Sequence, residues 1–222
     1  MDALAGDPVS AYGGVLVCNR PIDLDAAQDI NKLFIEVIVA PDYEEGVLDI
    51  LFSKKNRVIL KLKADQYNAQ IVKTALNGYL VQGRDLHTET ADDFKVITTK
   101  APTDAEIEDM IFANKIVKHS RSNAIVLAKG KQLCASGIGQ TSRVDALRQA
   151  IEKAKSFNLD LNGAVLASDA FFPFKDCVEL AHEAGITAIV QPGGSVRDQE
   201  SIDCCNENGI SMVFTGYRHF RH

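Results

Sequence analysis

The chain reads Gly163-Ala-Val-Leu-Ala-Ser-Asp-Ala-Phe-Phe-Pro-Phe-Lys-Asp176 in its second half. The apolar run at 163–167 predicts a buried strand, and the run at 177–182 predicts a helix. The loop between them holds three phenylalanines and a proline. Ligands of α/β proteins bind beyond the carboxyl ends of the strands. The loop therefore predicts either aromatic rings that stack on a flat ligand or a plug that fills a hydrophobic gap.

The rest of the chain alternates strand-like and helix-like patterns in the same way, which predicts an α/β fold. The predicted strands are 14–18, 36–40, 57–62, 78–81, 94–98, 124–128, 132–138, 163–167, 186–190 and 210–215. The predicted helices are 24–34, 43–55, 103–118, 142–156, 176–185 and 199–207. Thr103 and Glu106 have the spacing of a capping box, and Ser142 is a predicted N-cap.

Two parts of the chain resemble each other. Residues 6–41 and 168–192 both run from an Asp-containing loop through a helix and an apolar strand to a proline. This predicts two related α/β halves, with a portion of the first at 1–62, a connecting segment at 63–102 and the second at 103–222. Because only the second copy is preceded by further elements, we expect the front of the first half to be missing. The alternative is that the βα units are alike by chance.

Composition and charge exclude several classes of protein. The chain has 222 residues, a net charge of −6 and five cysteines without a Cys-x-x-Cys pair. These values argue against a nucleic-acid partner, a disulfide scaffold and a zinc site. Because the sequence has neither a signal peptide nor an apolar run near 18 residues, we expect a cytoplasmic protein without a membrane partner.

Polar and basic residues follow several predicted strands and helices. In the stretch 118–123, His119 could act as a base, Lys118 as a charge stabiliser and Asn123 as an orienting group. The ordinary interpretation of the Lys and His is that cations favour a helix C-terminus. The glycine turn at 137–143 could bind an anion, whereas capping explains 192–198. The tail at 217–222 is either loose or reaches a phosphate or carboxylate.

Several stretches together occur in the order found in one known family. They are 7–14, 36–41, 122–128, 139–145, 168–174, 191–197 and 218–222. On these motifs the chain closely resembles the C-terminal part of the bacterial bifunctional purine-biosynthesis family, AICAR transformylase/IMP cyclohydrolase. The resemblance covers nearly the whole chain. It implies two cytidine deaminase-like three-layer α/β/α subdomains, the first of them truncated.

The resemblance also implies a function in IMP biosynthesis. The family transfers a formyl group from the co-substrate 10-formyltetrahydrofolate to AICAR, and its members form homodimers that share each active site. By position, Tyr12 and Gly13 would line the nucleotide pocket and Glu36 would hold a polar edge of AICAR. Asn123 would orient the carboxamide.

The remaining implied ligand contacts lie in the second half. Ser142 and Arg143 would reach the ligand across the dimer. The residues that would hold AICAR and the folate pterin are Phe171, Pro173, Phe174 and Asp176. Arg218 and Phe220 would close on the nucleotide phosphate, a group that a guanidinium binds with two donors.

One departure from the family pattern affects catalysis. The family's catalytic Lys-His-x-x-Pro motif lies upstream of Met1, and Lys118-His119 matches a different position. We therefore expect no catalytic residue, no transition metal and no cyclohydrolase domain in this chain, which as given would be inactive alone. Three interpretations stay open: a piece of a formyltransferase, a truncated module that binds AICAR or folate, and a purely structural fragment.

Overall fold

The computed structural model describes residues 2–63 and 68–221. The chain forms two compact units, Met1–Arg84 and Asp85–His222, called unit 1 and unit 2 below. The boundary divides the segment 63–102 that we expected to connect two subdomains, because residues 85–102 belong to unit 2.

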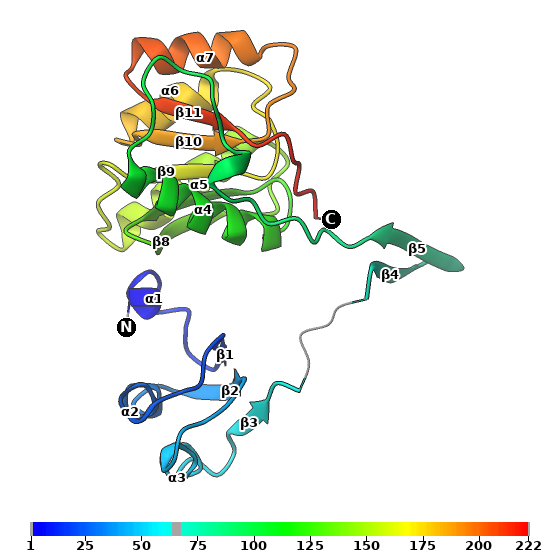
Figure 1. Cartoon of the computed structure of the whole chain (residues 1–222), viewed down its shortest axis with the longest axis vertical. Helices are drawn as coiled ribbons and strands as arrows, with labels where there is room; N and C mark the ends of the chain where they lie inside the picture. The colour runs from blue at the N-terminus through cyan, green and yellow to red at the C-terminus, as the bar shows by residue number, and fades with distance from the viewer. Residues whose placement is uncertain (1, 64–67, 222) are drawn as a thin grey trace. The chain divides into compact units, whose positions relative to one another are not determined.

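Unit 1 contains a three-stranded parallel sheet (Figure 1). In sheet order the strands are β1 (Gly14–Val17), β2 (Ile35–Ala40) and β3 (Val58–Lys61). The helices of unit 1 are α1 (Asp2–Ala5), α2 (Leu24–Asn31) and α3 (Val47–Leu51). Asp23 caps α2 by accepting a hydrogen bond from the Ala26 amide. The buried side chains of α2 and α3 pack on one face of the sheet against Ile35 and Ile38.

The opposite face of this sheet is apolar and exposed. Val15 and Val17 of β1 are exposed, and so are Val58 and Leu60 of β3. Parallel sheets normally bury both faces, and their strands are accordingly apolar throughout. The face therefore has the composition of a buried surface.

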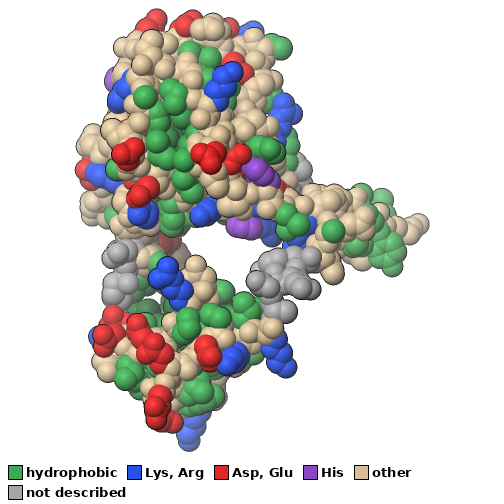
Figure 2. Space-filling model, in the orientation of Figure 1, with side chains coloured by type: hydrophobic (Ala, Val, Ile, Leu, Met, Phe, Trp, Pro, Cys, Tyr) green, Lys and Arg blue, Asp and Glu red, His purple; other side chains and the backbone are tan. Residues whose placement is uncertain are grey.

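An antiparallel hairpin ends unit 1. It consists of β4 (Gln70–Ala75) and β5 (Gly78–Gly83), and β5 is exposed along its whole length. Hydrophobic side chains stand on its surface in the space-filling view (Figure 2). A two-stranded hairpin is marginally stable by itself, so this element needs further contacts to be stable.

Unit 2 is built on a six-stranded mixed sheet. In sheet order its strands are β6 (Lys95–Val96), β11 (Ser211–Phe214), β10 (Ala188–Gln191), β9 (Val165–Ser168), β7 (Ile125–Lys129) and β8 (Gln132–Gly137). The central strands β9, β10 and β11 are parallel, whereas β7 runs antiparallel to β9.

Helices cover both faces of this sheet. The helices of unit 2 are η1 (Ala91–Asp93), α4 (Asp104–His119), α5 (Arg143–Ser156), α6 (Asp176–Glu183) and α7 (Asp198–Glu207). Alternate residues of β7 face opposite sides: Ile125 and Leu127 join the cluster with α5, α6 and α7, while Val126 and Ala128 join the cluster with α4. Unit 2 is therefore a three-layer α/β/α unit, and the predicted α/β class is confirmed.

The predicted helix caps are also present. Thr103 and Glu106 form the capping box of α4, and the Ser142 side chain accepts from the Asp145 amide at the start of α5. In unit 1 one prediction was wrong and one strand was not predicted. The helix predicted at 43–55 spans only α3, because Gly46 precedes it with a φ of +81°. The strand β4 was missed, since its polar composition gives a weak apolar pattern.

Candidate functional site

Several loops of unit 2 meet at one edge of the sheet. The carboxyl ends of β9, β10 and β11 lie there because these strands are parallel. The antiparallel pairing of Ile125 with Ser168 and with Gly137 brings the start of β7 and the end of β8 to the same edge. We call this the loop edge; it comprises residues 120–124, 138–143, 169–175, 192–197 and 215–221.

Arg143 ties three of these loops together. Its Nη2 donates to Asp169 Oδ1 and to Asn123 Oδ1, each over 2.9 Å, and its Nη1 donates to the Phe171 carbonyl over 3.1 Å. The Asn123 amide in turn donates to the carbonyls of Gln140 and of Thr141. These bonds fix the orientation of the Asn123 side chain.

Two polar atoms of this network have no hydrogen-bond partner. Asp169 Oδ2 and Arg143 Nε are buried without one among the described residues. Asp169 is fully buried and Arg143 is 9% exposed. Burying an unpaired polar atom costs free energy. The carboxylate thus keeps one acceptor atom unpaired inside the protein.

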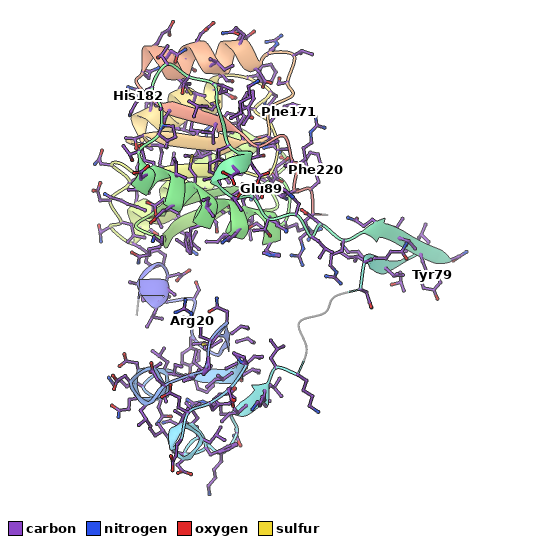
Figure 3. The ribbon with its side chains drawn as sticks, viewed as in Figure 1. Arg20, Tyr79, Glu89, Phe171, His182 and Phe220 are labelled. Carbon is purple, nitrogen blue, oxygen red and sulfur yellow. The ribbon has the colours of Figure 1, made fainter. Side chains whose placement is uncertain are left out.

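The aromatic loop after β9 both fills the core and offers rings at the surface. Phe172 is completely buried and lies in the main core cluster. Phe171, labelled in Figure 3, is half-buried, and Phe174 is exposed. The guanidinium of Arg218 lies 4.9 Å from the centre of the Phe171 ring, and that of Arg197 lies 5.0 Å from the Phe174 ring. Each ring is thus paired with a cation that is suited to an anionic ligand.

The loop after β10 is shaped by tight turns. Asp198 Oδ2 accepts hydrogen bonds from the amides of Gly194 and Ser195, over 2.7 and 3.1 Å. Gly193 has a φ of +71°, and a Cβ there would lie 2.4 Å from the Phe214 ring. Capping and turning therefore explain the glycines in this loop, as expected. They also place Arg197 at the start of α7, beside the aromatic loop.

The C-terminal tail is held in place at the loop edge. The His219 amide donates to the Asp169 carbonyl over 2.9 Å. Ser122 and Arg221 exchange two hydrogen bonds of 2.9 Å, and Arg221 Nη1 donates to the His119 carbonyl over 3.0 Å. These contacts bring Arg218 onto Phe171, while Phe220 stays exposed.

Lys118 differs from the ordinary helix-end cation that we expected. It is buried, and its Nζ lies 3.7 Å from Asp85 Oδ1 and 3.2 Å from the Thr88 hydroxyl, and also contacts the His87 carbonyl. The neighbouring His119 has its pKa lowered by burial and by the charge of Lys118. Lys118 thus binds the segment before η1.

A second group of predicted site residues lies in unit 1. The rings of Tyr12 and Phe34 are 4.7 Å apart, and the Gly13 amide donates to the Phe34 carbonyl over 2.9 Å. A Cβ at Gly13, whose φ is +72°, would lie 3.4 Å from the Phe34 ring and 4.0 Å from the Glu36 carboxyl carbon. Glycine therefore allows the close approach of Tyr12, Phe34 and Glu36.

Phe34 and Glu36 also line a cavity of about 470 Å³ in unit 1. Buried Arg57 forms part of its wall and donates to Asn31 Oδ1 over 2.8 Å and to the Ile35 carbonyl over 3.2 Å. The other lining residues are Lys32, Leu33, Ile35, Lys54, Lys55 and Asn56. The cavity thus combines an aromatic ring and a carboxylate with several basic side chains.

The structure gathers the predicted residues into one set in each unit. Asn123, Arg143, Phe171 and Arg218 are linked directly at the loop edge of unit 2. The other predicted residues of unit 2 are their near neighbours in the sequence: Ser142, Pro173, Phe174, Asp176 and Phe220. Asp176 accepts a hydrogen bond from the Cys177 amide at the start of α6. Tyr12, Gly13 and Glu36 form the set in unit 1.

Three residues of the loop edge were not on the predicted list. Asp169 could have been found as the acidic residue directly after a buried strand. Arg197 and His219 have no comparable local signal. Their contacts with Phe174, Asp85 and Glu89 join parts of the chain that are distant in sequence.

No helix in residues 2–63 and 68–221 has the length and apolar character that crossing a membrane requires. The same residues contain no group of three or more His, Cys, Asp or Glu side chains placed to hold a metal ion.

The sequence matches a family profile and many known proteins. The profile of the AICARFT/IMPCHase bienzyme matches residues 1–153. Proteins named bifunctional purine biosynthesis protein PurH are similar over essentially the whole chain. The one from Bacteroides thetaiotaomicron is 64% identical over 221 residues, which is 100% of this chain and 44% of that protein. The one from Acetivibrio thermocellus is 54% identical over 226 residues, 99% of this chain and 43% of that protein. The chain thus spans less than half the length of these relatives.

Similarity to solved structures is much lower. A dCMP deaminase from the cyanophage S-TIM5 in complex with dCMP and dUMP is 16% identical, with a TM-score of 0.37 over 51% of this chain and 98% of that chain. A diaminohydroxyphosphoribosylaminopyrimidine deaminase/5-amino-6-(5-phosphoribosylamino)uracil reductase from Thermotoga maritima is 23% identical. Its TM-score is 0.35, over 48% of this chain and 34% of that chain.

Proposed function

Because the chain belongs to the AICARFT/IMPCHase bienzyme family, we propose that it supplies ligand-binding surface of an AICAR transformylase. That enzyme transfers a formyl group from 10-formyltetrahydrofolate to the exocyclic amine of AICAR in IMP biosynthesis. We assign this chain the binding and orientation of the two ligands. We assign it no catalytic residue and no transition metal.

The single observation that carries this proposal is the placement of Arg218 over Phe171 beside the Arg143 network. AICAR has a flat heterocycle, a carboxamide and a phosphate. An aromatic ring suits the heterocycle, and a guanidinium at its face suits the phosphate. The orienting amide of Asn123, fixed by Arg143, suits the carboxamide.

The second ring supports a role in binding the co-substrate. Phe174 is exposed, and the guanidinium of Arg197 lies over its ring. The pterin of the folate could stack beside this ring while a carboxylate of the folate pairs with Arg197. Pro173 and Asp176 flank this ring, and Ser142 begins the helix that presents Arg143. Phe220 adds an exposed ring on the tail.

Unit 1 carries the other residues to which the family resemblance assigns ligand contacts. Tyr12 offers an exposed ring beside Phe34, and Glu36 offers an exposed carboxylate that can accept hydrogen bonds from an amine. Gly13 has no side chain to meet the Phe34 ring, which an added Cβ would contact at 3.4 Å. These features support the proposal that Tyr12, Gly13 and Glu36 line the nucleotide pocket.

We further propose that the two units contain related cytidine deaminase-like subdomains, the first at 1–62 and the second at 103–222. Each contains three parallel strands joined by two helices, in the order β1-β2-β3 and β9-β10-β11. In unit 2 the face formed by β9, β10 and β11 is covered by α4. The aliphatic face of β1 and β3 in unit 1 has the composition expected for a surface covered in the same way.

The proposal includes a homodimer in the cytoplasm, joined to the further part of the protein that its relatives contain. Exposed apolar side chains on the β4–β5 hairpin, with Tyr79 among them (Figure 3), support association with another surface. All five cysteines are free thiols, which supports a reducing compartment.

Calorimetric titration of the chain with AICAR and with a folate analogue tests the proposed function. We expect saturable binding of both. Phe171→Ala should weaken the binding of AICAR by roughly 0.5–1.5 kcal/mol beyond the effect of the lost buried area. Phe157→Ala, at the end of α5 away from the loop edge, is the matched control. Absence of binding to the wild-type chain, or an equal loss in both variants, would contradict the proposal.

A further inference from the structure

A charged cluster lies under the C-terminal tail at the loop edge. The His219 ring, 2% exposed, lies between two carboxylates: Nδ1 is 2.6 Å from Asp85 Oδ2, and Nε2 is 2.6 Å from Glu89 Oε1. The buried Lys118 approaches Asp85 from α4, with Nζ 3.7 Å from Oδ1. The cluster thus joins α4 and the segment before η1 to the tail.

We propose that this cluster is a proton-dependent latch, and that His219 is a positioning residue that holds Arg218 on the Phe171 ring. The latch itself follows from the contacts of His219. Its effect on a nucleotide phosphate rests on the proposed function. Closure requires a proton on both ring nitrogens, because each nitrogen faces a carboxylate oxygen that can only accept.

The position of His219 in the chain explains how the latch would act on the site. His219 directly follows Arg218, and its own amide donates to the carbonyl of Asp169, the residue that pairs with Arg143. The side chain of His219 is thus held by Asp85 and Glu89, and its backbone by Asp169. If the ring contacts are lost, the tail keeps the backbone bond to Asp169 and the contacts of Arg221. Arg218 then loses the side-chain anchor next to it in the chain and keeps its contact with the half-buried Phe171 ring.

Charge balance favours the closed form when His219 is protonated. Protonated His219 and Lys118 then offset the two carboxylates of Asp85 and Glu89. Burial alone lowers the pKa of His219, but the hydrogen bonds to Glu89 and Asp85 outweigh it and raise that pKa. The other charged or titratable groups around the cluster are His87, His119, Asp169 with its partner Arg143, Arg218 and Arg221.

The latch is tested first without ligand, on the 222-residue chain. Ring NMR signals give the titration of His219, and amide exchange at His219 and Arg221 gives the order of the tail. We expect His219 to titrate above the ordinary value of about 6.5. His219→Gln and Glu89→Gln should each speed amide exchange in the tail by about tenfold, because each variant loses a hydrogen bond to a charged group. His182→Gln, on the exposed side of α6, is the matched control and should change neither.

Ligand binding then separates the latch from the proposed function. AICAR and its phosphate-free nucleoside are titrated from pH 7 to 9, where the phosphate is already mostly doubly ionised and its remaining ionisation would only add negative charge. We expect wild-type affinity for AICAR to fall as pH rises, and the affinity of His219→Gln to be independent of pH. The affinity for the nucleoside should not change with pH in either protein.

An ordinary His219 pKa, or unchanged tail exchange in both variants, overturns the latch. Equal, pH-independent AICAR affinity in wild type and His219→Gln refutes the positioning role. If His219→Gln does not fold, the latch is tested by the titration of His219 in the wild type and by tail exchange in Glu89→Gln. Absence of AICAR binding would contradict the proposed function, and the latch would then be judged by the ligand-free titration and exchange alone.

Discussion

Arg143 donates a 2.9 Å hydrogen bond to Asp169, and the carboxylate that receives it is completely buried. The pair connects the start of α5 to the end of β9 and, through further bonds from Arg143, to Asn123 and Phe171. The geometry of the loop edge therefore depends on one buried ion pair. Loops held by such bonds are preorganised, which lowers the ordering cost of binding a ligand.

Asp169→Ala should destabilise unit 2 by about 3–5 kcal/mol, because it leaves the nearly buried Arg143 charge without a partner. The free energy of unfolding from urea titration measures this loss. Glu108→Ala is the control, since it removes an exposed pair with Lys131 that is screened by water. A loss at Asp169 as small as that at Glu108 would show that Arg143 is solvated by other means.

Gly137→Ala should also destabilise unit 2, by about 1–3 kcal/mol or more. A Cβ at Gly137 would lie 1.8 Å from the carbonyl oxygen of Ala146, so α5 would have to move away from β8. Gly83→Ala is the control, because no atom lies within 4 Å of its added Cβ. Thermal unfolding of the two variants compares them, and equal melting temperatures would contradict the tight approach of α5 to β8.

The sequence predicted most of the elements because their apolar patterns are strong. The strands β7, β9, β10 and β11 are buried along nearly their whole length, so each appears as a continuous apolar run. The hairpin strand β4 is mostly exposed and mixes Lys73 and Thr74 with aliphatic residues. Its pattern is therefore close to that of a loop.

The predicted site residues came mainly from a family resemblance and from the aromatic loop. Sequence alone could not show that Lys118 is buried against Asp85, or that His219 lies between Asp85 and Glu89. These partners are more than thirty residues apart in each pair, and no periodic pattern connects them. Tertiary packing of the tail decides their roles.

Stability should depend on pH through His219. Its folded-state pKa is raised because the hydrogen bonds to Glu89 and Asp85 outweigh burial, so the folded state binds the proton more tightly than the unfolded state. The contribution is fully present below the unfolded value of about 6.5 and is lost as pH rises through the folded value. Urea titrations of wild type and His219→Gln should thus differ most at low pH and converge at high pH. A difference that grows with pH would give the opposite sign and contradict the ion pairs.

Hydrogen exchange should distinguish the two units. Amides of 125–128, 165–167 and 189–190 should exchange slowly, because helices cover both faces of the unit 2 sheet. The strands β1 and β3 should exchange faster, since one face of their sheet exposes Val15, Val17, Val58 and Leu60. Equally slow exchange in residues 14–61 would contradict this difference in stability.

Calorimetry on Arg218→Ala is the most direct test of whether the loop edge binds a phosphate-bearing nucleotide through Arg218. AICAR and a phosphate-free folate analogue are titrated into wild type, Arg218→Ala and the control Arg148→Ala, which lies on the exposed side of α5. We expect Arg218→Ala to weaken the binding of AICAR by roughly 10- to 100-fold, because hydrogen bonds to a charged group are lost, and to leave the binding of the folate analogue almost unchanged. An equal loss for both ligands would contradict this binding role, because Arg218 would then hold the fold or an interface and not the phosphate.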